Sequence, residues 1–579
     1  MAHDLVIRNG LVVDGTGAPQ RRADVALDGD RITAVAPRCA AGRREIDAEG
    51  LLVTPGWVDI HTHYDGQATW DPDMTPSSWH GVTTTVFGNC GVGFAPVRPG
   101  SEKYLINLME GVEDIPETVL YEGLDFEWES FGDYLDVLER RPRVMDIGAQ
   151  VPHAALRFYV MGDRGAEHSE RPSDTEIAKM GRLLEEALHA GALGFTTSRT
   201  TKHKAADGRP TPSLTAEEPE LAGLALAMKR ASKGVIEVNS DFGPGEFELL
   251  RAAAELAGRP LSVLLVQMDS VPDLWAETLA KVDQAVAEGL EFTAQVGSRP
   301  IGMMLGLQGS LHPFTTHPLW LELEGLAPEA RVARIQEDAE LRRRLVAEIP
   351  DDEHVRWMTG ALERTFELGD PPDYEPAPEA AVARRARAAG RDPLELALEL
   401  MLEDGGEALL LHPFENYCSG DLRVVQAMLS NPNAVCGVAD GGAHVGLICD
   451  ASSPTSLLTH WARDRKRGPR LPLEHLVHKQ TQATARTYHL FDRGVIAPGY
   501  RADLNVIDFE RLSLKQPRVV RDLPAGGKRI VQGARGYRHT FLAGVEVARD
   551  DAFTGARPGV LLRGAQAAPA EAAAVATGD

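Results

Sequence analysis

The chain has 579 residues, of which 60 are basic and 85 acidic, so its formal net charge is -25. This charge repels nucleic-acid phosphates and anionic lipid surfaces, so we expect neither nucleic acid nor a membrane as a partner. The five cysteines are odd in number and widely spaced, which argues against a disulfide framework, and no export signal or long apolar stretch is present. A cytoplasmic protein is the resulting expectation.

Strand-like segments occur near both ends of the chain. Residues 4–53 contain short alternating runs, and Asp28-Gly29 between two of them is a tight-hairpin signal. Similar runs cover 502–508 and 537–548. Because neither region is long enough alone, we predict one small composite β-sandwich built from residues 1–55 and 486–555.

Between these regions, apolar strand-like runs alternate with helix-period segments, a pattern typical of parallel βα units. We expect strands near 58–63, 83–88, 144–151, 192–197, 234–240, 261–267, 291–296 and 434–440, and helices at 176–190, 246–257, 275–287 and 422–429. Eight such units predict an α/β fold with a (β/α)8 TIM barrel over residues 56–485. A ninth apolar run, 408–412, leaves the order of the last strands open.

Two further segments fall outside this repeat. Residues 309–405 are rich in Glu, Arg and Ala and predict inserted helices, which either cap the barrel mouth or form an excursion without function. Residues 556–579, rich in Ala near the end, are expected to form a flexible C-terminal tail.

The tripeptide His61-Thr62-His63 ends the first predicted barrel strand. Side chains two apart on a strand share a face, so both imidazoles can reach one metal ion, although an isolated pair of this kind is more often two ordinary polar residues. Cys90, Asn239 and Asp440 also follow predicted strands. Because the C-terminal strand ends of a barrel converge on one mouth, these residues can surround one ion. Taken alone, Cys90 is more simply a small buried apolar residue.

Three longer stretches carry a family resemblance. Residues 55–65, 81–91 and 493–504 resemble the amidohydrolase superfamily, and Gly88-Asn89-Cys90-Gly91 is similar to its N-acyl-D-amino-acid deacylase (D-aminoacylase) branch. The resemblance implies a metal-dependent barrel with a composite β-sandwich. It also implies particular roles: metal ligation by His61, His63 and Cys90, metal binding and proton transfer by Asp440, and a third-strand element at His153 and Arg157.

These roles agree with elementary chemistry. A divalent ion activates water near neutral pH and polarises a scissile carbonyl. Asp440 can take the proton of the water and pass it to the leaving nitrogen.

The chain departs from the deacylase pattern at two strand ends. Where the deacylases have metal-ligating histidines, this chain has Asn239 and Gln267, which are weak transition-metal ligands. We therefore expect one zinc ion rather than two. His203 and His444 follow strand ends and could compensate, although surface or hydrogen-bonding roles are the simpler interpretation. His312 and His412 are two further histidines that could compensate for the missing ligands, with the same simpler interpretation.

Arg199 and Arg299 also follow predicted strands. Arginine binds carboxylates through two parallel hydrogen bonds, so either residue could hold a substrate carboxylate. Ordinary ion pairing is the simpler interpretation of both.

The sequence therefore predicts a metal-dependent hydrolase that cleaves a linear C–N amide bond of a small molecule, with N-acyl-D-amino acids as the leading substrate class. One alternative is a hydrolase of cyclic amides, lactones or another carbonyl compound on the same barrel. Another is a non-catalytic barrel that lost its metal, an idea opposed by His61, His63 and Asp440. A homo-oligomer is an open possibility.

Overall fold

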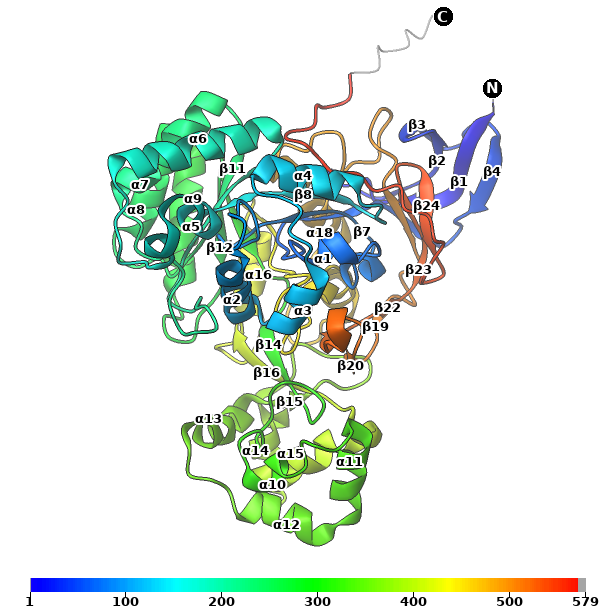
Figure 1. Ribbon diagram of the computed structural model, residues 1–579. Coiled ribbons are helices and arrows are strands. Elements are labelled where there is room, and N and C mark those ends of the chain that lie inside the picture. Colours follow the sequence, from blue (N-terminus) through cyan, green and yellow to red (C-terminus); the bar gives the residue numbers. More distant parts are fainter. Residues whose placement is uncertain (1, 571–579) are drawn as a thin grey trace, which may run out of the picture.

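The computed structural model describes residues 2–570 (Figure 1). Within them, parallel strands form a three-stranded sheet and a six-stranded sheet. The first contains β6 (Trp57–Asp59), β7 (Val82–Phe87) and β8 (Asp146–Ala149). The second contains β9 (Val151–Pro152), β10 (Gly194–Arg199), β11 (Val235–Ser240), β12 (Leu261–Leu265), β13 (Phe292–Val296) and β17 (Ala434–Cys436). Every strand predicted for the central region overlaps one of these.

Backbone contacts join the two sheets at two places. Only Gln150 separates β8 from β9, and its amide donates to the Phe87 carbonyl at 3.0 Å. On the other side, Thr62 after β6 forms a parallel bridge with Gly441 after β17, and the His63 amide donates to the Gly441 carbonyl at 2.8 Å. The C-terminal ends of the first and last strands therefore lie side by side.

Helices between the strands cover the six-stranded sheet on its outer side (Figure 1). They are α6 (Asp174–Ala190), α7 (Glu218–Ala231), α8 (Glu246–Ala257), α9 (Leu274–Ala287) and α16 (Arg423–Ser430). In α6, Ser173 and Glu176 form a capping box, and Met180, Leu184 and Leu188 are buried at helical spacing. The predicted helices are confirmed within a few residues at their ends.

Both chain ends contribute to one nine-stranded sheet, seen at the right of Figure 1. Its central pair is β5 (Leu52–Pro55) and β18 (Leu504–Ile507), which are antiparallel. The N-terminal members are β1 (His3–Val12), β2 (Arg21–Asp28), β3 (Arg31–Ala36) and β4 (Gly42–Asp47), and the C-terminal members are β23 (Tyr537–Leu542), β24 (Val545–Arg549) and β25 (Ala552–Phe553). Gly29 turns between β2 and β3 with a φ of +57°, as the Asp-Gly signal predicts.

The inserted segment forms a helical lobe below the main body in Figure 1. It contains α10 (Pro318–Leu321), α11 (Pro328–Glu337), α12 (Ala339–Ala347), α13 (Glu353–Ala361), α14 (Val382–Ala388) and α15 (Pro393–Met401), which share a core of their own. An antiparallel sheet of β14 (Ile301–Leu305), β15 (Phe366–Glu367) and β16 (Leu410–Glu415) lies at its base. The apolar run at 408–412 is therefore part of β16 and is not a strand of the parallel sheets.

The segment after the terminal sheet differs from the expected flexible tail. Leu561 and Leu562 are buried, and the Leu562 amide donates to the Ile147 carbonyl at 2.7 Å. The Gln566 amide donates to the His489 carbonyl at 2.9 Å. The flexible tail was predicted from the alanine-rich composition of the segment, which does not show that these two leucines are buried against the main body. The remainder of the predicted tail, residues 571–579, lies outside the described residues.

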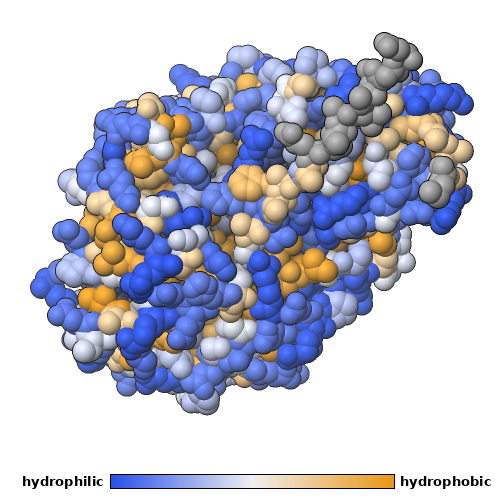
Figure 2. Space-filling view, turned by 90° about the horizontal axis from the view of Figure 1, so that it is seen from above, coloured by the Kyte–Doolittle hydropathy of each residue, from blue (hydrophilic) through white to orange (hydrophobic). Residues whose placement is uncertain are grey.

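The face shown in Figure 2 is mostly hydrophilic, with hydrophobic residues in small separate groups. Among residues 2–570, no helix combines the length and apolar character needed to cross a bilayer.

Candidate metal centre

His61 and His63 lie just after β6 and are both buried. Between them, the Thr62 hydroxyl donates to the Val86 carbonyl at 2.9 Å, so the two imidazoles point to the opposite side. His61 Nε2 lies 3.4 Å from Cys90 Sγ. One ligand atom from each of His61, His63 and Cys90 lies within 4.8 Å of the others. The structure thus brings together three residues that the sequence placed on two separate strand ends.

The turn after β7 holds Cys90 in place. The Asn89 amide group donates to the carbonyls of Thr62 and Val86, each at 3.0 Å. Cys90 has a φ of +54°, and a Cβ atom on Gly91 would approach the Ser198 nitrogen to 2.6 Å. Asn89 and Gly91 therefore permit the close packing that directs the Cys90 thiol toward His61.

Asp440 brings a carboxylate to the same cluster from the segment after β17. Its amide donates to the His61 carbonyl at 3.1 Å. Its Oδ1 lies 3.5 Å from His61 Nε2 and 3.8 Å from His63 Nε2, and is buried without a hydrogen-bond partner among residues 2–570. Ligands around a four-coordinate ion with bonds of about 2.0–2.3 Å are about 3.3–3.8 Å apart, so these separations fit one ion.

Burial controls the protonation of these groups. Burial lowers the pKa of His61 to about 4, although a hydrogen bond with Gln295 acts to raise it. Burial also lowers the pKa of His63. Both imidazoles are therefore neutral at pH 7 and have a lone pair available. Burial raises the pKa of Asp440 and of the Cys90 thiol, so an ion would compensate for the unfavourable burial of their charged forms. Nitrogen, sulfur and oxygen donors together suit zinc.

Asn239 and His203 border the cluster. The Asn239 Nδ2 atom lies 3.4 Å from Cys90 Sγ and 3.3 Å from His203 Nε2. His203 Nδ1 lies 2.9 Å from the Ser198 hydroxyl, and burial lowers the pKa of His203 to about 3. This imidazole is thus held neutral beside Asn239 by the loop that follows β10.

Two buried glutamates near the cluster were missed by the sequence reasoning. Glu237 in β11 accepts a hydrogen bond from the Cys90 amide at 3.0 Å, and burial raises its pKa to about 8. It lies two residues before Asn239, so strand periodicity could have identified it. Glu113 ends α2 (Glu102–Glu113) and lies 3.1 Å from His63 Nδ1 and 3.8 Å from His444 Nε2. No strand-end argument could have identified this residue.

Gln267 has different neighbours from Asn239. Its side-chain amide donates to the Pro272 carbonyl at 3.3 Å, and its backbone amide donates to Asn416 at 2.8 Å. The two amide residues that the sequence treated as equivalent therefore occupy different environments.

His153 and Arg157 lie in a buried group around Glu220. His153 is 2.9 Å from the Thr197 hydroxyl through Nδ1 and 3.0 Å from Glu220 Oε1 through Nε2. Arg157 Nε lies 3.3 Å from the same carboxylate oxygen. Glu220 belongs to α7, so this group connects the start of α5 (His153–Met161) to a helix of the outer layer.

The two arginines predicted as carboxylate ligands have internal partners. Arg199 pairs with Glu246 and donates to the Ala216 carbonyl at 2.8 Å. Arg299 pairs with Asp450 at 2.9 Å and stacks on the Tyr374 ring, with its guanidinium carbon 3.9 Å from the ring centroid. Either residue would have to exchange an existing partner to bind a substrate carboxylate.

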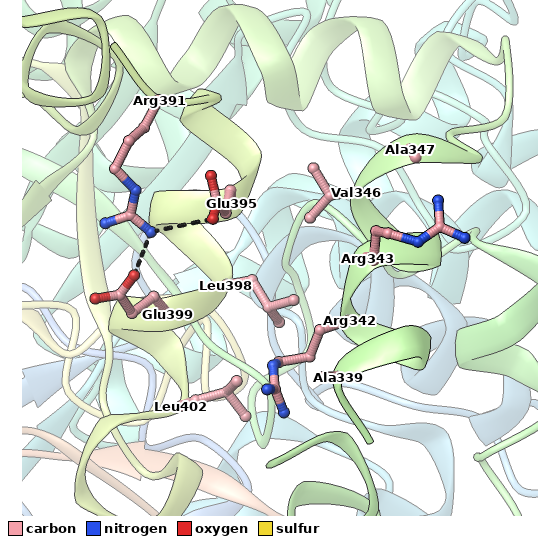
Figure 3. Close-up of a pocket in the computed structure, with 10 residues that line it drawn as sticks. All are labelled: Ala339, Arg342, Arg343, Val346, Ala347, Arg391, Glu395, Leu398, Glu399 and Leu402. Carbon is pink, nitrogen blue, oxygen red and sulfur yellow. Dashed lines mark hydrogen bonds and ion pairs between the residues drawn. The ribbon is translucent and has the colours of Figure 1, made fainter. Parts of the chain in front are cut away.

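A cavity of about 650 Å³ lies in the helical lobe, between α12 and α15 (Figure 3). Val346, Leu398 and Leu402 line it, and Arg391 pairs with Glu399 on its wall. Because its lining comes only from the lobe, this cavity does not belong to the cluster around His61.

The fold and this cluster agree with the comparison of the chain with known proteins. The amidohydrolase family model matches residues 44–548. The chain therefore belongs to the amidohydrolase family, as the motif resemblance implied.

Individual relatives point to the same branch. The chain is 38% identical to D-aminoacylase of Alcaligenes xylosoxydans xylosoxydans over 195 residues, which are 34% of this chain and 37% of that protein. It is 29% identical to N-acyl-D-aspartate deacylase of the same organism over 577 residues, 98% and 96% of the two chains. A solved D-aminoacylase, described by its binuclear metal centre, superimposes with a TM-score of 0.63 at 25% identity, covering 97% of this chain and 100% of that one. The D-aminoacylase match thus spans less than two thirds of that relative.

Proposed function

We propose that the protein is a metal-dependent amidohydrolase that cleaves the linear amide bond of an N-acyl amino acid, with D-configured substrates preferred. The observation that carries the proposal is the buried group of His61, His63 and Cys90 at the ends of parallel strands, with Asp440 Oδ1 3.5 Å from His61 Nε2 and 3.8 Å from His63 Nε2, in a chain of the amidohydrolase family. Relatives named D-aminoacylase and N-acyl-D-aspartate deacylase supply the substrate class.

The proposed roles follow from the positions of the side chains. His61, His63, Cys90 and Asp440 would hold the ion. A bound divalent ion supplies the Lewis acidity that activates water and polarises the scissile carbonyl. Asp440 Oδ1, which has no hydrogen-bond partner in the described part of the chain, accepts the proton of the attacking water and returns it to the leaving nitrogen. Asn239 and His203 border this position and are available to hydrogen-bond the substrate.

We further propose one zinc ion per chain. The solved D-aminoacylase is described by a binuclear centre, together with one-metal activation and second-metal attenuation. In this chain an amide, Asn239, lies beside the thiol where an imidazole would strengthen a second site, and amides are weak ligands.

The proposal also covers the domain architecture and the cellular location of the protein. We infer that β6–β8, β9–β13 and β17 act as one (β/α)8 barrel within residues 56–485, because contacts at Gln150 and at Thr62 join the two parallel sheets. Residues 1–55 and 486–555 would form the composite β-domain. We also propose that the protein is cytoplasmic and acts on a small-molecule substrate. A homo-oligomer is compatible with this proposal.

Zinc content and a substrate panel test the function together. Purified protein should contain about one equivalent of zinc and hydrolyse N-acyl-D-amino acids faster than their L-enantiomers, cyclic amides or lactones. The variant carrying His61→Ala and His63→Ala should lose both zinc and activity, since three- or four-ligand sites tolerate little loss. His189→Ala, at an exposed position on α6, is the matched control. Turnover by the zinc-free double variant would refute the mechanism, and selective turnover of a cyclic substrate would replace the substrate class.

A further inference from the structure

We propose that Glu113 is a positioning residue of the metal centre, which orients His63 and fixes the loop that carries Asp440 and His444. This inference rests on the proposed metal centre but not on the substrate. It assigns a role to a residue that belongs to a helix, outside the strand ends that supply the other groups.

The environment of Glu113 is unfavourable for a carboxylate that has only a structural role. The side chain is 1% exposed, and neither carboxylate oxygen has a hydrogen-bond partner among the described residues. It also stands in the last turn of α2, where the helix dipole disfavours negative charge. A buried carboxylate left in this way is unfavourable, because its charge is desolvated without a partner. The groups that face it are therefore the ones through which it acts on the site.

Those groups are two imidazoles of the cluster. Glu113 Oε1 lies 3.1 Å from His63 Nδ1, and His63 Nε2 lies on the Asp440 side, 3.8 Å from Oδ1. These two atoms are within hydrogen-bonding distance, but no hydrogen bond joins them in the described residues. Once aligned, a carboxylate that accepts from Nδ1 would fix the proton on that nitrogen and leave Nε2 as the metal-binding lone pair.

His61 also faces an oxygen on one side and the cluster on the other, and here the hydrogen bond is formed. Its Nδ1 lies 2.8 Å from Gln295 Oε1, and its Nε2 lies 3.4 Å from Cys90 Sγ. Each cluster histidine thus has one nitrogen facing the proposed ion and the other facing an oxygen acceptor from elsewhere in the fold. The facing oxygen belongs to an amide for His61 and to a carboxylate for His63, and a carboxylate that accepts from Nδ1 would make His63 the stronger metal ligand of the two.

The same residue contacts the loop after β17. The His444 amide donates to the Glu113 carbonyl, and His444 Nε2 lies 3.8 Å from Glu113 Oε2. Asp440 begins this loop, and the Ala443 amide donates to the Asp440 carbonyl at 3.0 Å. Glu113 therefore connects the end of α2 to the segment that places Asp440, through its backbone and its side chain.

The test measures metal binding directly. Zinc affinity by chelator competition, and the visible spectrum of the cobalt-substituted protein, are compared for the native chain, Glu113→Ala, Glu113→Gln and Glu110→Gln. Glu110 lies on the same helix and accepts a hydrogen bond from the Glu117 amide at 3.1 Å, so its variant controls for loss of charge on α2. Thermal unfolding of the metal-free proteins reports any structural effect.

We expect Glu113→Ala to weaken zinc binding by about 10- to 100-fold and to change the cobalt spectrum, as loss of a carboxylate behind a ligating histidine does. Glu113→Gln, which keeps an acceptor for His63, should recover part of the affinity. Glu110→Gln should bind zinc like the native chain, and the metal-free Glu113 variants should unfold at or above the native temperature. Native affinity and spectrum in both Glu113 variants would overturn the proposal, as would a drop in metal-free stability that accounts for the loss of affinity.

These outcomes separate the two proposals. If the native protein binds zinc but hydrolyses no N-acyl amino acid, the substrate class fails and the Glu113 comparison still holds. If the protein is an active deacylase whose Glu113 variants bind zinc normally, only the positioning role fails.

Discussion

At the scale of single residues, Asn239 is the side chain that we propose limits the cluster to one ion. Its amide group lies between Cys90 Sγ and His203 Nε2, at 3.4 and 3.3 Å. An imidazole at the same place would put a nitrogen ligand beside the sulfur and the His203 ring, which is the composition of a zinc site. Under the proposed one-zinc site, this single side chain at the end of β11 would set the difference between one ion and two.

Asn239→His should raise the zinc content from about one toward two equivalents per chain, because a second set of nitrogen and sulfur ligands then exists. Gln267→His is the matched control, since Gln267 contacts the Pro272 carbonyl instead of the cluster. Zinc analysis after removal of loosely bound metal gives the comparison. Equal stoichiometry in both variants would show that position 239 does not set the metal number.

Asp440→Asn should lower turnover by about two to four orders of magnitude, the usual range for a general acid–base group. The amide keeps the size of the side chain but cannot take up the proton. Circular dichroism and the KM of the variant establish whether the fold and substrate binding persist. Turnover close to that of the native protein would remove Asp440 from the proton-transfer role.

At the scale of elements, α2 packs closely against the loop that carries His203. A Cβ atom on Gly111 would approach the Ala205 carbonyl carbon to 2.2 Å and the Lys204 carbonyl oxygen to 2.3 Å. These are backbone atoms that cannot rotate away, so the helix and the loop fit only with glycine at this position. The helix thereby holds two parts of the site at once, Glu113 at its own end and His203 on the neighbouring loop.

Gly111→Ala should destabilise the protein by about 1–3 kcal/mol, the usual cost of overpacking, and weaken zinc binding because the loop is displaced. Gly360→Ala provides the control. Gly360 lies in helix α13, where an added Cβ atom would have no neighbouring atom within 4 Å, so alanine there should stabilise the protein by about 0.5–1 kcal/mol. Chemical denaturation and zinc affinity measure both effects. A Gly111→Ala protein as stable as the native one would contradict the packing argument.

Sequence patterns predicted the elements whose signals are local. The parallel strands followed from apolar runs, and His61 with His63 followed from the two-residue period of a strand. Glu113 could not be predicted in this way, because its burial depends on contacts with residues more than 300 positions further along the chain. The run at 408–412 was ambiguous, since a buried antiparallel strand and a buried parallel strand have the same apolar composition.

At the scale of the whole molecule, a buried ion pair joins the inserted segment to the main body. Glu375 accepts hydrogen bonds from Arg465 at 3.0 and 3.1 Å, and lies 3.1 Å from His460 Nε2. Burial acts to raise the pKa of Glu375, but the His460 and Arg465 contacts outweigh it and lower the pKa to about 2. The carboxylate therefore stabilises the folded state in its charged form.

Because this pKa is lower in the folded than in the unfolded chain, the stabilisation is complete above about pH 4.5 and is lost as the pH falls toward 2. Glu375→Gln should lower the free energy of unfolding by about 3–5 kcal/mol at pH 7 and flatten its decline between pH 5 and pH 2. The exposed Glu510 provides the control variant Glu510→Gln. Denaturation curves measured between pH 5 and pH 2 give the free energy of unfolding of each variant. If this free energy falls with pH in Glu375→Gln as steeply as in the native protein, Glu375 is not the group responsible.

The pairing of β5 with β18 also determines when the protein can finish folding during its synthesis. The residues that pair, 52–55 and 504–507, are separated by about 450 positions, which a ribosome adds in roughly 20–90 s at 5–20 residues per second. Throughout that interval the growing chain has strand β5 without its later neighbour, so an open strand edge is available to other nascent chains. Emergence of residues 504–553 from the ribosome is thus the event that completes this sheet, and the yield of native protein should depend on how well the edge is protected until then.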